Sequence, residues 1–192
     1  MANATLAVGG VIGLVLTIPL VGSLIPSKEV LASGAHWWPV KEEDFAKLKT
    51  SSDPIQLYFT RKVQDAYTPP VESEDYVWGV KMSDAEFAKM KAERVDLSQG
   101  EGKLSYPFFE MGFVIFSSIC PHLGCKFDWK QELNKFVCPC HNSEFLKDGE
   151  HVAGPAARGL DPLPLREQSG KAEITWIQYK SAIAGRIIIT YS

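Results

Sequence analysis

The chain has 192 residues, of which 45% are hydrophobic and 22% are charged. This length suits one ordinary domain with an appendage, and the composition excludes a disordered or fibrous protein. The formal net charge is −3, from 20 basic and 23 acidic residues, so we expect no nucleic-acid binding, which depends on clustered lysine and arginine.

The first predicted element is a membrane anchor over residues 1–27. This segment contains no charged residue, and its apolar part, Leu6–Ile25, reads LAVGGVIGLVLTIPLVGSLI. Twenty helical residues rise about 30 Å, the thickness of the hydrocarbon core of a bilayer. A cleaved signal peptide is the alternative, but it would carry a basic start and a shorter apolar run. We therefore predict one retained transmembrane helix.

Residues 28–40 are predicted to form a flexible neck. The stretch from Pro26 to Ala35 is small, polar and glycine-containing, a composition that buries little surface. Trp37 and Trp38 follow, and they either lie at the membrane interface or begin the soluble core.

Residues 41–192 show the pattern of a mainly β head domain. Short runs of β-branched and aromatic residues between turn residues are typical of strands. These runs are Ile55–Thr60, Asp75–Val80, Gly112–Ser117, Ile174–Tyr179 and Arg186–Tyr191. Two helices are also expected. One covers Glu42–Lys49, and the other begins at Ser83–Glu86, which has the spacing of a capping box.

The residues that carry chemistry are concentrated in two short stretches. CPHLGC at 120–125 and CPCH at 138–141 contain all four cysteines and two of the four histidines. A Cys2His2 zinc site would use four of these six side chains. It would leave two thiols unexplained, and the spacing differs from the usual Cys-x2-Cys and His-x3-His.

CPHLGC followed by CPCHNS resembles the two boxes of the Rieske iron–sulfur proteins, with the consensus Cys-x-His-x-Gly-Cys and Cys-x-Cys-His-x-Ser. The resemblance implies a [2Fe-2S] cluster with two thiolates on the inner iron and two imidazoles on the outer iron. By this resemblance the ligands are Cys120 and Cys138 on the inner iron and His122 and His141 on the outer iron.

The same resemblance assigns the two remaining cysteines, Cys125 and Cys140, to a disulfide that joins the two loops. The corresponding boxes of ring-hydroxylating oxygenases and their soluble ferredoxins are shorter and lack this cysteine pair. A disulfide persists best outside the reducing cytosol. We therefore expect a single-pass protein of the plasma or inner membrane, with its head on the periplasmic or extracytoplasmic side.

Further positions resemble the surroundings of the cluster. Gly154-Pro155-Ala-Ala is similar to the Gly-Pro-Ala-Pro loop that covers the cluster in cytochrome bc1 and b6f complexes, without its last proline. Ser143 matches a serine that donates to a bridging sulfide. Phe145 stands where high-potential relatives have a tyrosine that donates to a ligand thiolate, which predicts a lower midpoint potential and suits a low-potential quinol such as menaquinol. Leu123 is expected to pack at the docking site on a partner.

The fold implied by the resemblance is a Rieske-type antiparallel β-sandwich, with a cluster-binding subdomain at about residues 118–158. The function implied is that of the electron-transfer subunit of a cytochrome bc-type quinol:cytochrome c oxidoreductase. In such a complex, quinol bound to the partner cytochrome b hydrogen-bonds to His141, and the head then moves on its neck to reduce a c-type cytochrome. The complex would be dimeric and embedded in lipid.

Two alternatives remain open on the sequence. One is a Rieske subunit of another exported oxidoreductase of the arsenite-oxidase type, which would not use a quinol. The other belongs to a different class, a zinc-stabilised, membrane-tethered binding module.

Overall fold

The structure is a computed structural model that describes residue 17 and residues 36–192, except 64–68, 94–108, 111 and 192. The chain divides into two compact units, Met1–Gly34 and Ala35–Ser192. The predicted anchor over 1–27 lies outside the described residues apart from Thr17, and so does most of the predicted neck. Among the described residues, no helix combines the length and apolar character needed to cross a membrane. The second unit is the head.

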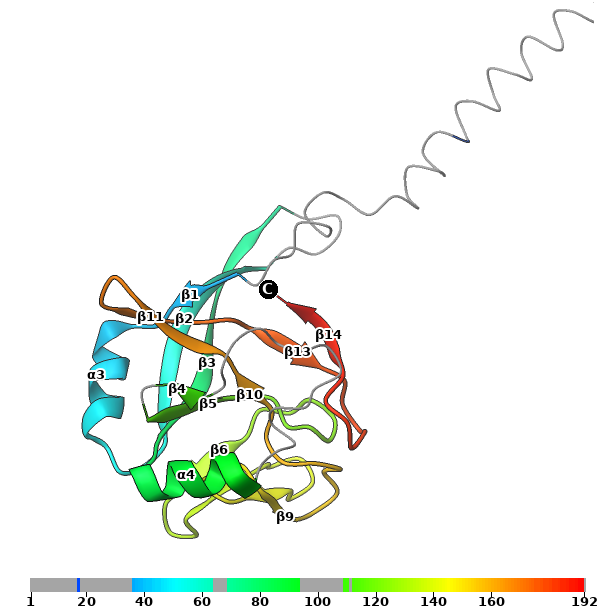
Figure 1. Cartoon of the computed structure of the whole chain (residues 1–192). Helices are drawn as coiled ribbons and strands as arrows, with labels where there is room; N and C mark the ends of the chain where they lie inside the picture. Colours follow the sequence, from blue (N-terminus) through cyan, green and yellow to red (C-terminus); the bar gives the residue numbers. More distant parts are fainter. Residues whose placement is uncertain (1–16, 18–35, 64–68, 94–108, 111, 192) are drawn as a thin grey trace, which may run out of the picture. The chain divides into compact units, whose positions relative to one another are not determined.

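The described head is mainly β, as predicted (Figure 1). Its helices are α3 (Glu42–Thr50) and α4 (Asp84–Glu93). Its first strands are β1 (Trp38–Pro39), β2 (Ile55–Val63), β3 (Val71–Lys81), β4 (Phe109–Glu110), β5 (Phe113–Ser117), β6 (Asp128–Lys130) and β7 (Lys135–Val137). The remaining strands are β8 (Glu144–Phe145), β9 (His151–Ala153), β10 (Pro162–Leu163), β11 (Leu165–Gln168), β12 (Lys171–Ile174), β13 (Ile177–Tyr179) and β14 (Ile188–Tyr191).

A central antiparallel sheet runs in the order β10-β5-β3-β2, with β4 paired to β5. Strand β5 has the sequence FVIFS, and all five of its residues are buried. Strands that are covered on both faces read as continuous apolar runs rather than as alternating ones. The central sheet is therefore the middle layer of the head, with a hydrophobic core on each side.

The first core lies between the central sheet and two smaller antiparallel sheets, β1-β12-β11 and β13-β14. Helix α3 covers part of the same side and buries Phe45 and Leu48. Leu57 of β2 and Ile174 of β12 are fully buried in this core, and Trp38 packs against it. This half of the head is called the base here.

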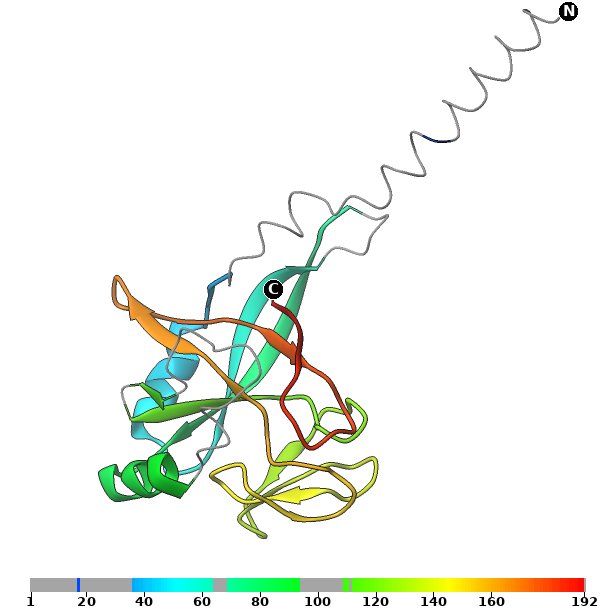
Figure 2. The same ribbon diagram turned by 45° about the vertical axis from the view of Figure 1, so that its right-hand side comes forward.

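The second core lies on the opposite face of the central sheet, against the antiparallel sheet β6-β7-β8-β9 (Figure 2). Trp78 and Phe116 come from the central sheet, and Phe127, Phe136 and Phe145 come from the other side. Residues 118–158, which include this second sheet, are called the small subdomain. It is built on an aromatic core, and its contact with the central sheet positions the residues of both cysteine stretches.

The structure confirms most of the predicted elements. The capping box is formed: the Ser83 N–H donates to Glu86 Oε2 at 2.8 Å, and the Glu86 N–H donates to Ser83 Oγ at 3.3 Å. The single strand predicted over Ile174–Tyr179 is wrong. The chain leaves one sheet after Ile174 and joins another at Ile177, because Ile174 pairs with Leu165 of β11 whereas Ile177 pairs with Tyr191 of β14.

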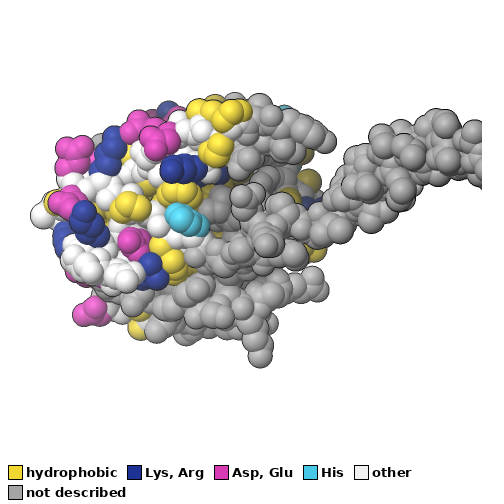
Figure 3. Space-filling model, turned by 90° about the horizontal axis from the view of Figure 1, so that it is seen from above, with side chains coloured by type: hydrophobic (Ala, Val, Ile, Leu, Met, Phe, Trp, Pro, Cys, Tyr) yellow, Lys and Arg dark blue, Asp and Glu magenta, His cyan; other side chains and the backbone are white. Residues whose placement is uncertain are grey.

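Charges of both signs are interspersed on the described part of the face that Figure 3 shows. Several ion pairs tie elements together. Asp75 of β3 is one centre, with Arg61 Nη2 at 3.1 Å and Lys126 Nζ at 2.8 Å. Because Lys126 follows the first cysteine stretch directly, this pair of contacts links the base to the small subdomain.

Candidate metal centre

The two cysteine stretches form turns with the same backbone pattern. In the first loop, residues 120–125, the N–H of Cys120 donates to the Cys125 carbonyl at 2.7 Å. In the second loop, residues 138–143, the N–H of Cys138 donates to the Ser143 carbonyl at 2.9 Å. In each loop the fifth residue also donates back to the carbonyl of the first, at 3.0 Å. Two six-residue turns therefore place a cysteine at the same point of each.

Each turn needs its fifth residue in the left-handed region. Gly124 has φ 86° in the first loop, and Asn142 has φ 55° in the second. Glycine adopts this region without steric cost, and asparagine is the side chain that tolerates it best. The glycine of the first box and the residue before the serine of the second box thus have a backbone role.

The first residues of the two turns bring two thiols together. Cys120 and Cys138 are buried, neither is in a disulfide, and their side chains hydrogen-bond to each other. Burial raises the pKa of the Cys120 thiol to about 11, although hydrogen bonds from the His122 N–H and the Ser143 hydroxyl partly offset it. The thiolate form, which binds metals, therefore requires a cation that compensates for burial.

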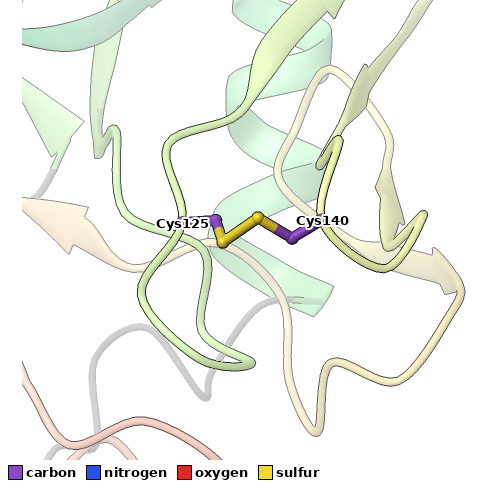
Figure 4. The surroundings of a disulfide bond; sticks show 2 residues. All are labelled: Cys125 and Cys140. Carbon is purple, nitrogen blue, oxygen red and sulfur yellow. A yellow bond between two sulfur atoms is a disulfide. The ribbon is translucent and has the colours of Figure 1, made fainter.

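The other two cysteines, Cys125 and Cys140, form a disulfide between the loops (Figure 4). It is the pair that the resemblance assigns to a disulfide. The sulfur of Cys138 lies within 4.8 Å of both disulfide sulfurs. Sulfurs that are bonded to each other are not thiolate ligands, so these three sulfurs are not a metal site by themselves.

The two histidines lie side by side at the outer end of the loops. The ring centroids of His122 and His141 are 4.7 Å apart, and their planes meet at 87°. His122 is half-buried and His141 is exposed, whereas both free thiols are buried. The donor set is therefore two thiols on the inside and two imidazoles at the surface.

A third loop, residues 154–157, lies against the second loop. Gly154 has φ 87°, and a Cβ atom there would come within 2.6 Å of the Asn142 carbonyl oxygen. The Ala156 N–H donates to Ser143 Oγ at 3.1 Å, and Ser143 is fully buried. Pro155 is exposed, and so is Leu123 of the first loop, with 61% of its surface accessible. The structure thus places two of the predicted site residues, Gly154 and Ser143, in contact, and the other two at the outer surface.

Phe145 lies in the aromatic core beneath the loops and is fully buried. Its ring packs near Phe127, with centroids 5.9 Å apart, and near His151 at 5.5 Å. Trp78 joins this core to the central sheet by donating its Nε1 hydrogen to the Phe127 carbonyl at 3.3 Å. The loops therefore rest on a packed apolar platform, with Phe145 part of it.

Sequence reasoning missed a buried ion pair that supports the first loop from outside. Arg158 donates to both carboxylate oxygens of Asp161 at 2.8 and 2.7 Å and to the Ile183 carbonyl at 2.7 Å. The neighbouring Ala182 N–H donates to the Pro121 carbonyl at 2.9 Å. Arginine and aspartate usually lie at the surface, so no pattern in the sequence signalled this contact.

The comparisons with known proteins agree with this site. Residues 72–164 match the family model described as the Rieske [2Fe-2S] domain. The chloroplastic cytochrome b6-f complex iron-sulfur subunit of Bigelowiella natans is 46% identical over 55 residues, 29% of this chain and 22% of the relative. The cytochrome b6-f complex iron-sulfur subunit of Chlorobaculum tepidum is 32% identical over 87 residues, 41% of this chain and 45% of the relative. The matches therefore span less than half the length of these relatives.

Among solved structures, the plasma membrane Rieske protein PetC3 from Synechocystis PCC 6803 is 22% identical, with a TM-score of 0.35. That likeness covers 68% of this chain and 93% of the other. A chain of a hyperthermophilic respiratory Complex III is 20% identical, with a TM-score of 0.38, over 90% of this chain and 98% of the other. Scores at this level support no conclusion of their own.

Two thiols and two imidazoles on two loops that a disulfide joins are the donor set of a Rieske-class iron–sulfur site. The family match covers both loops and the Gly154 loop. The chain therefore contains a Rieske [2Fe-2S] domain over residues 72–164. The residues present fit the cluster, because the two cysteines not used in the disulfide are the buried pair and both loop histidines lie at the same end.

Proposed function

We propose that this chain is the electron-transfer subunit of a membrane-bound, bc-type quinol:cytochrome c oxidoreductase. One observation carries the proposal. The two ligand loops are joined by a disulfide, and they expose the imidazole of His141 and the side chain of Leu123. The matched relatives named as cytochrome b6-f iron-sulfur subunits support the same complex type. The partners we propose are a cytochrome b subunit, a c-type cytochrome, a quinol and membrane lipid, in a dimeric complex.

The proposed ligand set follows the burial of the donors. Cys120 and Cys138 would hold the inner iron, and His122 and His141 the outer iron. A bound cluster supplies one-electron chemistry, and its two neutral imidazole ligands give such centres a higher potential than all-cysteine clusters, a general property of Rieske ligation. The chain's own part is to hold the imidazoles at the surface and the thiols away from water.

His141 is the residue proposed to meet the quinol. An imidazole that uses one ring nitrogen for iron carries its proton on the second nitrogen, and this nitrogen becomes an acceptor when that proton is lost. Because His141 is exposed, this second nitrogen, once deprotonated, can accept a hydrogen bond from a quinol hydroxyl and then its proton. Leu123 and Pro155, both exposed beside the ligand loops, would exclude water from the contact with the partner.

The proposed location is the plasma or inner membrane, with a single N-terminal span and the head on the extracytoplasmic side. The Cys125–Cys140 disulfide supports this side, because disulfides persist in oxidising compartments.

The experiment is to express the chain in a host that assembles iron–sulfur clusters and to purify it with its membrane partners. We expect two irons and two sulfides per chain, a Rieske-type electron paramagnetic resonance (EPR) signal after reduction, co-purification with a cytochrome b, and reduction by quinol. A colourless protein with one zinc would contradict the cluster. A cluster that is present but never reduced by quinol, in a preparation without cytochrome b, would instead favour the arsenite-oxidase type of partner.

A further inference from the structure

A buried hydroxyl without a hydrogen-bond partner lies two residues before the first proposed ligand. Ser118 is fully buried, and its Oγ has no partner among the described residues. A buried hydroxyl that makes no hydrogen bond costs about 1–3 kcal/mol. Native proteins contain few buried polar groups without a hydrogen-bond partner. Such a group beside the proposed cluster site suggests that its partner is not part of the polypeptide.

The neighbours of Ser118 show where in the head it is buried. Ser117 and Ile119 line a cavity of about 540 Å³ between the central sheet and β13, and Ser118 does not line it. Phe116 belongs to the aromatic core of the small subdomain, and Cys120 borders both that core and the cavity. Ser118 is therefore buried away from this cavity, in the chain between two residues of that core.

The Ser118 hydroxyl is also close to Cys120 along the chain. The chain bends at Ser118, so Ser118 and Cys120 lie no further apart than the ~6.6 Å that two residues of extended chain would span. A serine hydroxyl and a sulfur atom carried by the cysteine two positions on can close that gap by side-chain rotation. Ser118 and Cys120 are thus close along the chain, and both are fully buried.

A further hydrogen-bond donor at the Cys120 end of the site would affect the reduction potential. In the structure its sulfur accepts hydrogen bonds from the His122 N–H and the Ser143 hydroxyl. Phe145, in the core beneath, has no hydroxyl to add. Hydrogen bonds to cluster sulfurs stabilise the reduced, more negative state and raise the reduction potential.

We propose that the Ser118 hydroxyl donates a hydrogen bond to the anionic sulfur of the cluster at its Cys120 end, and so raises the midpoint potential. This role rests on the [2Fe-2S] assignment. Ser118 is then a positioning and tuning residue, not a ligand.

The chain offers a matched control. Thr175 is also fully buried with an unpartnered hydroxyl, but it lies in the base between β12 and β13. The variants are therefore Ser118→Ala, Thr175→Val and Ser118→Thr, the last of which keeps a hydroxyl at position 118. Each is studied without the cluster by urea unfolding, and with the cluster by redox titration followed by EPR.

Without the cluster, Ser118→Ala and Thr175→Val should both be at least as stable as the wild type, because each removes an unpaired hydroxyl. With the cluster, only Ser118→Ala should shift the midpoint potential downward, and Ser118→Thr should stay near the wild-type value. EPR detects the loaded fraction alone, so a variant with low occupancy still reports its potential. The Fe–S stretching bands in resonance Raman spectra should lose part of their shift between H₂O and D₂O in Ser118→Ala.

An unchanged potential in Ser118→Ala would overturn this inference alone, and so would equal falls in Ser118→Ala and Thr175→Val, which would indicate general loosening. A buried water that satisfies Ser118 would give the unchanged result. A wild type without a [2Fe-2S] signal would overturn the cluster assignment, and this inference with it.

Discussion

Gly154 lies so close to Ser143 that a Cβ atom on Gly154 would come within 2.5 Å of the Ser143 Cα atom. Real Cβ atoms do not approach backbone this closely, so only glycine lets the third loop pack on the second. The contact also brings Ala156 to the Ser143 hydroxyl. The third loop is therefore held against the ligand loop by backbone shape.

Gly154→Ala should open this contact. The left-handed φ alone costs about 1–2 kcal/mol for alanine, and the overlap with Ser143 should add about 1–3 kcal/mol. Gly170→Ala is the control, since Gly170 has φ 77° and nothing within 4 Å of its Cβ position. Urea unfolding and iron retention measure both. If the two variants lost equal stability and kept equal iron, the packing explanation would be wrong.

His141→Ala should remove an attachment of the outer iron and abolish quinol oxidation. The control is His151→Ala, because His151 packs on Phe145 at a ring distance of 5.5 Å and belongs to neither loop. The EPR spectrum of the reduced protein reports the outcome, and His151→Ala should retain it. A native spectrum in His141→Ala would rule out the proposed ligand set.

Replacing the disulfide by Cys125→Ser with Cys140→Ser should destabilise the head and make the cluster labile. The bridged residues are 15 apart in sequence, and a loop of this size corresponds to about 3 kcal/mol in the chain-entropy treatment. The cluster should still assemble in part, because neither residue is a proposed ligand. Thiol titration of the denatured, unreduced apoprotein checks the pairing: we expect two free thiols, and four would contradict it.

Phe145→Tyr should raise the midpoint potential by adding a phenol donor near the ligand thiolate. Phe136→Tyr is the control, because Phe136 is equally buried in the same core and pairs with Phe145 across β7 and β8. Both changes place a hydroxyl in an apolar core, so both should lower stability. Only the first should move the potential in a redox titration. An unchanged or lowered value in Phe145→Tyr, with the spectrum intact, would refute the low-potential prediction for this chain.

Asp75 should make the stability of the head depend on acid pH. Burial by itself would raise the pKa of this carboxyl, but hydrogen bonds and charge from Lys126 and Arg61 outweigh burial and hold the pKa below its ordinary 3.8. A carboxyl with a lowered folded pKa contributes stability above its unfolded value, near pH 4, and loses it as the pH falls through the folded pKa.

The test compares urea unfolding at pH 7 and pH 3. Asp75→Asn should cost about 1.5–3 kcal/mol at pH 7, the range for hydrogen bonds to a charged group, and should weaken the fall in stability toward pH 3. Glu74→Gln is the neighbouring control, because the Glu74–Lys41 pair is exposed and should contribute little. Identical pH profiles in wild type and Asp75→Asn would show that Asp75 is not the group responsible.

The sequence alone determined the class of site. The four cysteines and two histidines of the two boxes can be recognised in the sequence by their spacing. They lie close together in the chain, and their chemistry depends on residue type. The capping box of α4 is likewise local, so short-range pattern was enough to predict it. The runs of β2, β3 and β5 could be recognised from their β-branched and aromatic residues, and in β5 burial on both faces leaves a continuous apolar stretch.

Tertiary structure decided what depends on contacts between distant segments. The chain breaks between β12 and β13 because β12 pairs with β11 and β13 pairs with β14. No residue at 174–179 indicates this break in the sequence. The Arg158–Asp161 pair is buried only because the loop at 182–186 comes to lie on the first ligand loop. Ser118 reads as an ordinary serine, and only its burial without a partner sets it apart. Burial and partner choice are properties of the packed chain, which is why the sequence indicated the proposed ligands but not the residues that support them.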